Sequence, residues 1–151
     1  LLASKLLGNL NTTDNLLGDN CIELTPTNQV SNPTLEGPFM PISFRKGNTI
    51  DVTIVGKIKG TATSMNPAIR IAGTDAAGPE TGYDSFEGLE NFSSISGSGY
   101  NNTTWSTNVY QITNAFGSEI KTDVTGQLAL YNDQLNSGDS WLIDSITILV
   151  S

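Results

Sequence analysis

The chain has 151 residues, of which 15 are acidic and 7 are basic, so its formal net charge at pH 7 is -8. A surface this acidic repels the phosphates of nucleic acids and of anionic membranes, which proteins bind mainly through lysine and arginine. The chain has no histidine and one cysteine, Cys21, which excludes a Ser-His-Asp triad, a Cys-His pair and an intrachain disulfide. We therefore expect no nucleic-acid partner, no membrane partner and no catalysis of these kinds.

The composition favours strands and loops over helices. Gly, Asn and Ser each occur 15 times and Thr 18 times. These residues favour turns, caps and loops, and Thr also favours strands. No apolar run approaches the ~18 residues that a membrane span needs. Length and composition together predict one domain of many short strands joined by polar loops.

The N-terminal residues 1–14 are predicted to be a linker or an extension from a preceding domain. Apolar side chains stand at a nearly helical spacing up to Leu10, and polar residues then interrupt the pattern. A short helical turn and an edge strand are the alternatives for this stretch. The domain proper is expected over residues 15–151. Because the chain does not begin with methionine, we expect it to be part of a longer polypeptide.

Seven later segments have the pattern of strands. The clearest is 50–59, where Ile50, Val52 and Ile54 alternate with polar residues, as in a half-buried antiparallel strand. The other segments are 20–24, 39–44, 68–72, 104–116, 127–131 and 141–150. Residues 73–99 are mostly polar and lack periodicity, and so long a loop is often functional. Repeated strands without a long helix predict an all-β fold, an antiparallel β-sandwich of jelly-roll type.

Strict alternation divides the last predicted strand into two faces. It places Trp141 and Ile143 on one face and Leu142, Ile146 and Ile148 on the other. Trp141 is predicted to pack in the core or at the sheet edge rather than to contact a ligand.

Three stretches match a known pattern in their order and spacing. Asn-Leu-Leu at 15–17 precedes the first predicted strand, and Lys-Gly-Asn-Thr at 46–49 leads into the long strand that follows. Residues 141–148 form a closing strand with the pattern Trp-x-x-Asp-x-Ile. Together these stretches resemble the jelly-roll carbohydrate-binding modules, in particular those embedded in phage tail and baseplate (distal tail) proteins. The resemblance extends from about residue 15 to residue 150, and residues 73–99 have no counterpart in it.

The resemblance implies a non-catalytic module that binds saccharide in a groove or at a loop edge lined by aromatic, amide and acidic side chains. In a phage tail the implied ligand is a polysaccharide on the bacterial cell surface, and the implied location is extracellular, on the virion tail. The other implied partners are neighbouring domains of the parent protein, and binding requires no cofactor. Two alternatives remain open: the substrate-targeting module of a secreted glycan-degrading enzyme, and a structural β-domain without a ligand.

A candidate carbohydrate site lies in and beside the polar middle of the chain. Aromatic rings stack on the apolar faces of sugars, and amides hydrogen-bond to the hydroxyl groups. The residues that offer this combination are Tyr83, Tyr100, Asn101, Asn102, Trp105 and Tyr110. The segment 100–105 is the strongest part, because two aromatic residues flank two amides in a polar stretch. The alternative is that Trp105 begins a strand and packs inward while the amides serve only the turn.

The resemblance also implies a structural calcium ion that ties the first and last strands together through carboxylates. Asp144 matches the aspartate of the closing strand, and Glu23 lies in the first predicted strand, where a partner is expected. The residues themselves leave an alternative, in which Asp144 is exposed or accepts hydrogen bonds from the backbone.

An enzyme is not expected. Glycoside cleavage needs only two carboxylates at a suitable separation, and among 15 acidic residues some such pair arises by chance. A chain without histidine and without a recognisable acid motif is expected to bind polysaccharide rather than to cleave it.

Overall fold

The computed structural model describes residues 7–18, 20–25, 35–36, 40–45, 47–75, 88–115, 123–132 and 135–151. These residues form strands and no helix, so within them no helix is present that could span a membrane. The strands, in chain order, are β1 (Leu7–Asn11), β2 (Cys21–Thr25), β3 (Leu35–Glu36), β4 (Met40–Arg45), β5 (Ile50–Lys59), β6 (Ala68–Asp75), β7 (Gly88–Asn91), β8 (Ser93–Ser96), β9 (Ser106–Ile112), β10 (Asp123–Asn132) and β11 (Ser140–Val150).

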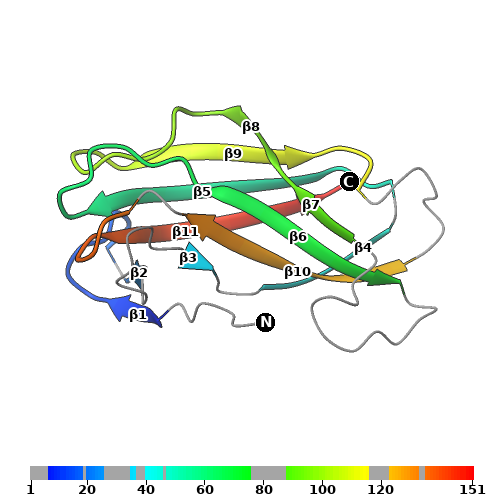
Figure 1. Ribbon diagram of the computed structural model, residues 1–151, viewed down its shortest axis with the longest axis horizontal. Coiled ribbons are helices and arrows are strands. Elements are labelled where there is room, and N and C mark those ends of the chain that lie inside the picture. The colour runs from blue at the N-terminus through cyan, green and yellow to red at the C-terminus, as the bar shows by residue number, and fades with distance from the viewer. Residues whose placement is uncertain are drawn as a thin grey trace.

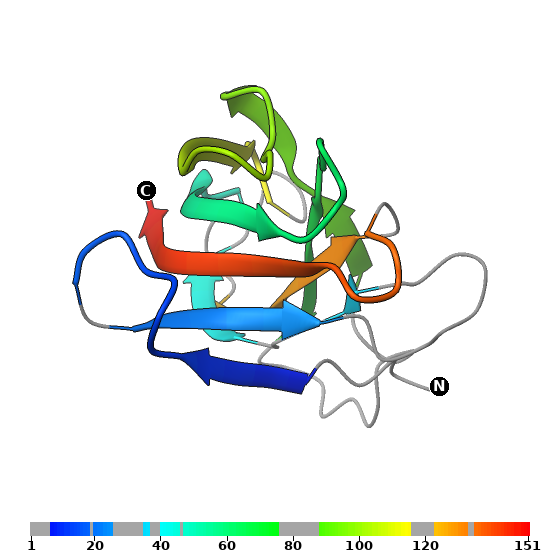
Figure 2. The same cartoon turned by 90° about the vertical axis from the view of Figure 1, so that its left-hand side faces the viewer.

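The strands form two antiparallel sheets that pack face to face as a sandwich (Figure 1). One sheet has six strands in the order β1-β2-β11-β5-β9-β8. The other has five strands, in the order β3-β10-β6-β7 with β4 also paired to β10. Figure 2 looks onto the six-stranded sheet, with β1 at its lower edge. The predicted all-β antiparallel sandwich of jelly-roll type is confirmed.

The core lies between the sheets and is built from alternate residues of the strands. In β5, Ile50, Val52, Ile54 and Ile58 are fully buried, whereas the alternate residues 51, 53, 55 and 57 are half-buried on the outer face. The five-stranded sheet contributes further buried side chains, namely Ile42, Phe44, Ile69, Ile71, Leu128 and Leu130. The period of two in the sequence therefore decides which face of each strand enters the core.

A β-bulge at Asp144 reverses the faces of β11. The register of β11 against β5 shifts between Ile143 and Ser145, because one extra residue stands opposite β5. Trp141 and Ile143 face the core before the bulge, as predicted, and Ile146 and Ile148 pack against the same core after it. The prediction that these last two residues lie on the face opposite Trp141 is wrong, and the bulge is the reason.

Each of the seven predicted strands overlaps a strand of the structure, but the sequence pattern misses four others: β1, β3, β7 and β8. β1 pairs with β2 over its whole length, so the edge-strand alternative describes residues 7–11. The predicted domain boundary after residue 14 therefore follows a strand that already belongs to the sheet. β7 and β8 lie within 73–99, where a long loop was the expectation, and both are short edge segments.

Gly56 stands in β5 where the two largest core rings meet. The ring centroids of Trp141 and Tyr100 are 5.3 Å apart. A Cβ at residue 56 would lie 2.7 Å from Trp141 Nε1 and 2.9 Å from the carbonyl oxygen of Leu142. Glycine therefore lets the two rings pack directly against the backbone of β5.

We expect Gly56→Ala to lower the free energy of unfolding by about 1–3 kcal/mol, because the added methyl group overpacks the core. Urea unfolding followed by tryptophan fluorescence measures the change. An unfolding midpoint equal to that of the wild type would contradict this packing.

Candidate functional site

The loops that follow β5, precede β9 and precede β11 gather at one end of the sandwich, on the left in Figure 1. Asp139, which is buried, joins two of them. Its Oδ1 accepts hydrogen bonds from the backbone N–H of Thr61 at 2.6 Å and from the Thr61 hydroxyl at 3.2 Å. Its Oδ2 accepts from the backbone N–H of Asn136 at 3.1 Å. One carboxylate therefore holds the β5 loop against the β11 loop.

The charge of Asp139 is stabilised by these donors. Burial by itself raises the pKa of Asp139, but hydrogen bonds from the backbone N–H groups of Thr61, Asn136 and Ala62 outweigh burial and hold the pKa below its usual 3.8. Gly60 allows the close approach, because it has a φ of +131° and a Cβ there would overlap Asp139 Oδ1. This end of the sandwich is therefore a built scaffold for the turn that precedes β9.

Asn101 closes that turn. Its Oδ1 accepts hydrogen bonds from the backbone N–H groups of Thr103 and Thr104, each at 2.8 Å, and its Nδ2 donates to the Thr104 hydroxyl at 3.2 Å. Asn102 donates from Nδ2 to the carbonyl oxygen of Gly60 at 3.3 Å. The sequence left open that these amides stabilise the turn rather than bind a sugar. This alternative accounts for the hydrogen bonds of the Asn101 side chain and for one bond of Asn102.

Tyr100 and Tyr110 lie in the core, 2% and 4% exposed. The Tyr100 hydroxyl donates to the carbonyl oxygen of Ile54 at 3.1 Å, and burial raises the pKa of both tyrosines. A ring without an open face cannot stack on a sugar that arrives from solvent. We therefore correct the assignment of these two residues: both are core residues, Tyr100 next to the turn of residues 101–104 and Tyr110 within β9.

Trp105 is half-buried and stands directly before β9. Tyr83, the remaining residue of the predicted site, lies outside the described residues. The structure thus brings Asn101, Asn102 and Trp105 together on one turn and separates them from the two core tyrosines.

The sheet surface beside Trp105 was not predicted as part of a site. On the outer face, Thr107 and Val109 of β9 lie opposite Val55 and Thr53 of β5, and none of the four is buried. Continuing the alternation of Thr107 and Val109 back by two residues puts Trp105 on their side of the sheet, and we call Trp105 with these four residues the Trp105 face. The sequence signal that could have found it is the alternation in 50–59, because the residues that alternate with the core residues must lie on the outer face. An aromatic ring, valine methyl groups and threonine hydroxyls on one face can contact both the apolar and the polar parts of a sugar.

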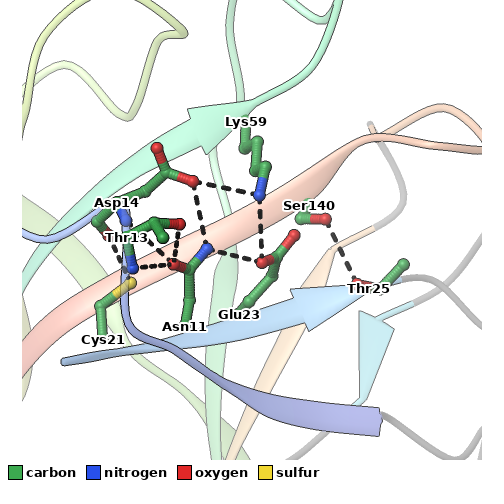
Figure 3. A network of polar contacts seen from close by, with 8 residues as sticks. All are labelled: Asn11, Thr13, Asp14, Cys21, Glu23, Thr25, Lys59 and Ser140. Carbon is green, nitrogen blue, oxygen red and sulfur yellow. Dashed lines mark hydrogen bonds and ion pairs between the residues drawn. The ribbon is translucent and has the colours of Figure 1, made fainter.

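A polar network lies on the same outer face, nearer the β1 edge (Figure 3). Asn11 donates from Nδ2 to Glu23 Oε2 at 2.7 Å and to Asp14 Oδ2 at 3.2 Å. Lys59 Nζ lies 3.0 Å from Asp14 Oδ2 and 3.4 Å from Glu23 Oε2. The four polar groups therefore join β1, β2 and β5 with the loop that follows β1.

The contacts of this network favour the charged forms of its members. The hydrogen bonds from Lys59 and then Asn11 hold the pKa of Asp14 below its usual value, and the same bond to Asp14 is the main cause that raises the pKa of Lys59. For Glu23, burial raises the pKa, but hydrogen bonds from Ser140, Asn11 and Lys59 outweigh it and lower the pKa overall.

Glu23 and Asp144 do not fit a calcium ion bound between them. Glu23 Oε2 already accepts from an amide and an ammonium group. Asp144 Oδ1 accepts from the backbone N–H groups of Leu16 at 2.9 Å and Leu17 at 3.3 Å, and its buried Oδ2 has no hydrogen-bond partner among the described residues. Calcium takes six to eight oxygen ligands. Within the described ranges, no group of three Asp, Glu, His or Cys side chains is placed to hold a metal ion.

No family model matches the sequence, and no curated protein matches it. Solved structures match the fold. The CBM22-1 xylan-binding domain of Paenibacillus barcinonensis Xyn10C is 14% identical, with a TM-score of 0.53 over 96% of this chain and 81% of that domain. A family 16 carbohydrate-binding module is 13% identical, with a TM-score of 0.55 over 98% and 87%. A Bacteroides thetaiotaomicron protein described as sugar-binding is 12% identical, with a TM-score of 0.53 over 100% and 85%. This chain therefore shares their β-sandwich.

The hydrogen bonds of Asp139 predict an acid-dependent stability. Its folded pKa lies below the unfolded value, so its contribution is complete above pH 3.8 and is lost as the pH falls through the folded pKa. We expect Asp139→Asn to lower the free energy of unfolding by about 1–3 kcal/mol at neutral pH. Thermal unfolding followed by circular dichroism should show this difference shrinking below pH 3.8. A difference that stays constant across the acid range would contradict the role of the charge.

Proposed function

We propose that this chain is a non-catalytic carbohydrate-binding module. The observation that carries the proposal is the match of the whole sandwich to such domains, which extends over 96% and 99% of this chain for two xylan-binding domains and over 98% for a family 16 module. The sequence resemblance, which rests on residues 15–17, 46–49 and 141–148, points to the same class independently. Neither source locates the ligand, so its position is argued from the surface.

We assign binding to the Trp105 face. Its indole is half-buried, so one part of the ring is anchored while another remains open to solvent. The turn that carries it is held by the Asn101 side chain and by the bond from Asn102 to Gly60. A ring held in place by a preformed turn loses little conformational freedom when it stacks on a sugar. Asn102 and the threonines of the face then supply hydrogen bonds to hydroxyl groups.

The described carboxylates support binding without cleavage. Asp14 and Glu23 are paired with Lys59, Asp51 accepts a hydrogen bond from Gln111, and Asp139 and Asp144 accept bonds from backbone amides. Glycosidases instead use two carboxylates that flank the scissile bond. The contacts of these five side chains are structural, and none belongs to the Trp105 face.

For the ligand we propose a polysaccharide of the bacterial cell surface, bound outside the cell by a larger protein such as a phage tail component. The weak affinity expected of one shallow face is raised when several copies bind one surface together. A substrate-targeting module of a glycan-degrading enzyme is the second candidate. It is favoured by matches within two larger enzymes, an endo-xylanase and an arabinofuranosidase, in which the matched part is 25% and 23% of the chain.

Retention of the fluorescently labelled chain on intact bacteria and on insoluble xylan tests these readings. Retention on cells supports the proposed ligand, and retention on xylan alone supports the enzyme-targeting module. If the folded chain is retained on neither, nor on a wider panel of polysaccharides, the proposal is wrong.

Trp105→Ala is expected to weaken binding to the retained polysaccharide about tenfold, because stacking on the indole is lost. Affinity electrophoresis measures the change. Leu17→Ala is the matched control: it also removes an apolar side chain, 73% exposed, from a loop on the other part of the same sheet. Equal affinities of Trp105→Ala and the wild type would contradict the assignment of binding to the Trp105 face.

A further inference from the structure

The loop of residues 12–18 covers part of the outer face of the six-stranded sheet. Leu142 belongs to this face because it lies on β11 between the core residues Trp141 and Ile143, and Cys21 belongs to it because it alternates with the core residue Leu24 along β2 on the side of Glu23. The two side chains are nevertheless only 1% and 2% exposed. Asp14 in the loop accepts a hydrogen bond from the Cys21 thiol at its carbonyl oxygen, at 2.8 Å. The backbone of Leu16 donates to Asp144. The loop thus packs over the outward-facing thiol of Cys21 and is fastened to β11 at Asp144, two residues after the buried Leu142.

We propose that Lys59 supplies the cation that holds this loop against the sheet. Lys59 is the last residue of β5, and Glu23 is in β2; the two strands are separated by β11. Its ammonium group therefore reaches across one strand to bond Glu23 and, in the loop, Asp14 (Figure 3).

The charges make the lysine necessary to this arrangement. Asp14 and Glu23 both accept a hydrogen bond from the same Asn11 amide group, at 3.2 and 2.7 Å, so the two carboxylates face each other across a single nitrogen. Without a cation, like charges at this separation repel each other. Lys59 bonds the same two oxygens from the other side and neutralises the repulsion. A divalent ion is not needed for this pair, because its place beside both oxygens is filled by the ammonium group.

The network and Asp144 hold the loop at two separate points. Lys59 and Asn11 hold Asp14 at the start of the loop, and Asp144 Oδ1 holds the N–H groups of Leu16 and Leu17 two to three residues later. Release of the first point is expected to open the loop over Cys21 without unfolding the sheet. Because Cys21 is the only cysteine of the chain, its thiol reports the opening directly.

The experiment measures the rate at which iodoacetamide, a neutral reagent, labels Cys21 in the full chain, in EDTA and in millimolar calcium. We expect the wild-type rate and the melting temperature to be the same in both solutions. Lys59→Gln should speed labelling by about 2–5-fold, as expected for the loss of a partly exposed ion pair, and should lower the melting temperature by about 2 °C. Lys57→Gln is the matched control, because it removes the same charge from the same strand two residues away and acts on Asp14 only through a weaker, longer-range attraction. It should change both the labelling rate and the melting temperature less than Lys59→Gln does.

Two results would overturn the proposal. Calcium that slows labelling or raises the melting temperature of the wild type would mean that a metal ion holds the loop. Equal labelling rates for Lys59→Gln and Lys57→Gln would mean that Lys59 does not. If Lys59→Gln does not fold, the calcium titration of the wild type decides, and Lys59→Arg, which keeps the cation, should label at the wild-type rate. None of these outcomes depends on whether the chain binds a carbohydrate.

Discussion

The antiparallel pairing of β5 with β11 is the contact on which the rest of the structure depends. It joins the middle of the chain to its last strand along the whole of β5 and places both at the centre of the six-stranded sheet. Because β5 alternates strictly, one face of this pair is the apolar floor of the core and the other is left for polar contacts. Both functional surfaces proposed for this protein, the Trp105 face and the loop held by Lys59, are built on that outer side.

The strongest periodic signals in the sequence predict the fold well. The alternation in β5 and the position of Trp141 both describe what the structure contains, because burial of a sheet face follows directly from spacing. The bulge at Asp144 could not be predicted from this spacing. One inserted residue does not change the composition of the strand, yet it exchanges the inner and outer faces of every residue that follows in β11. The sequence of β1 was also ambiguous between a linker, a helical turn and an edge strand. An edge strand pairs on one side only, so it can form without a clear alternation of apolar residues.

The candidate site was predicted less well than the fold, for a physical reason. Tyr100 stands among glycine, serine and asparagine, which is typical of an exposed loop, but its ring turns inward to Trp141 while its neighbours form the turn outside. Local polarity describes the backbone of such a segment and not the direction of each side chain. The negative charge has a similar explanation: the described acids mostly hold loops and strands together, so their number gives no measure of catalytic or metal-binding capacity.

The two tryptophans offer the most direct measurement of where a ligand binds. Trp105 is half-buried on the outer face, and Trp141 is fully buried with an indole nitrogen that has no hydrogen-bond partner within the described part of the chain. In a ¹H-¹⁵N NMR titration with soluble fragments of the retained polysaccharide, the indole signal of Trp105 and the amides of β9 and β5 should shift, while the indole signal of Trp141 stays in place. Shifts confined to β6 and β10, with both indole signals unchanged, would contradict the assignment of binding to the Trp105 face.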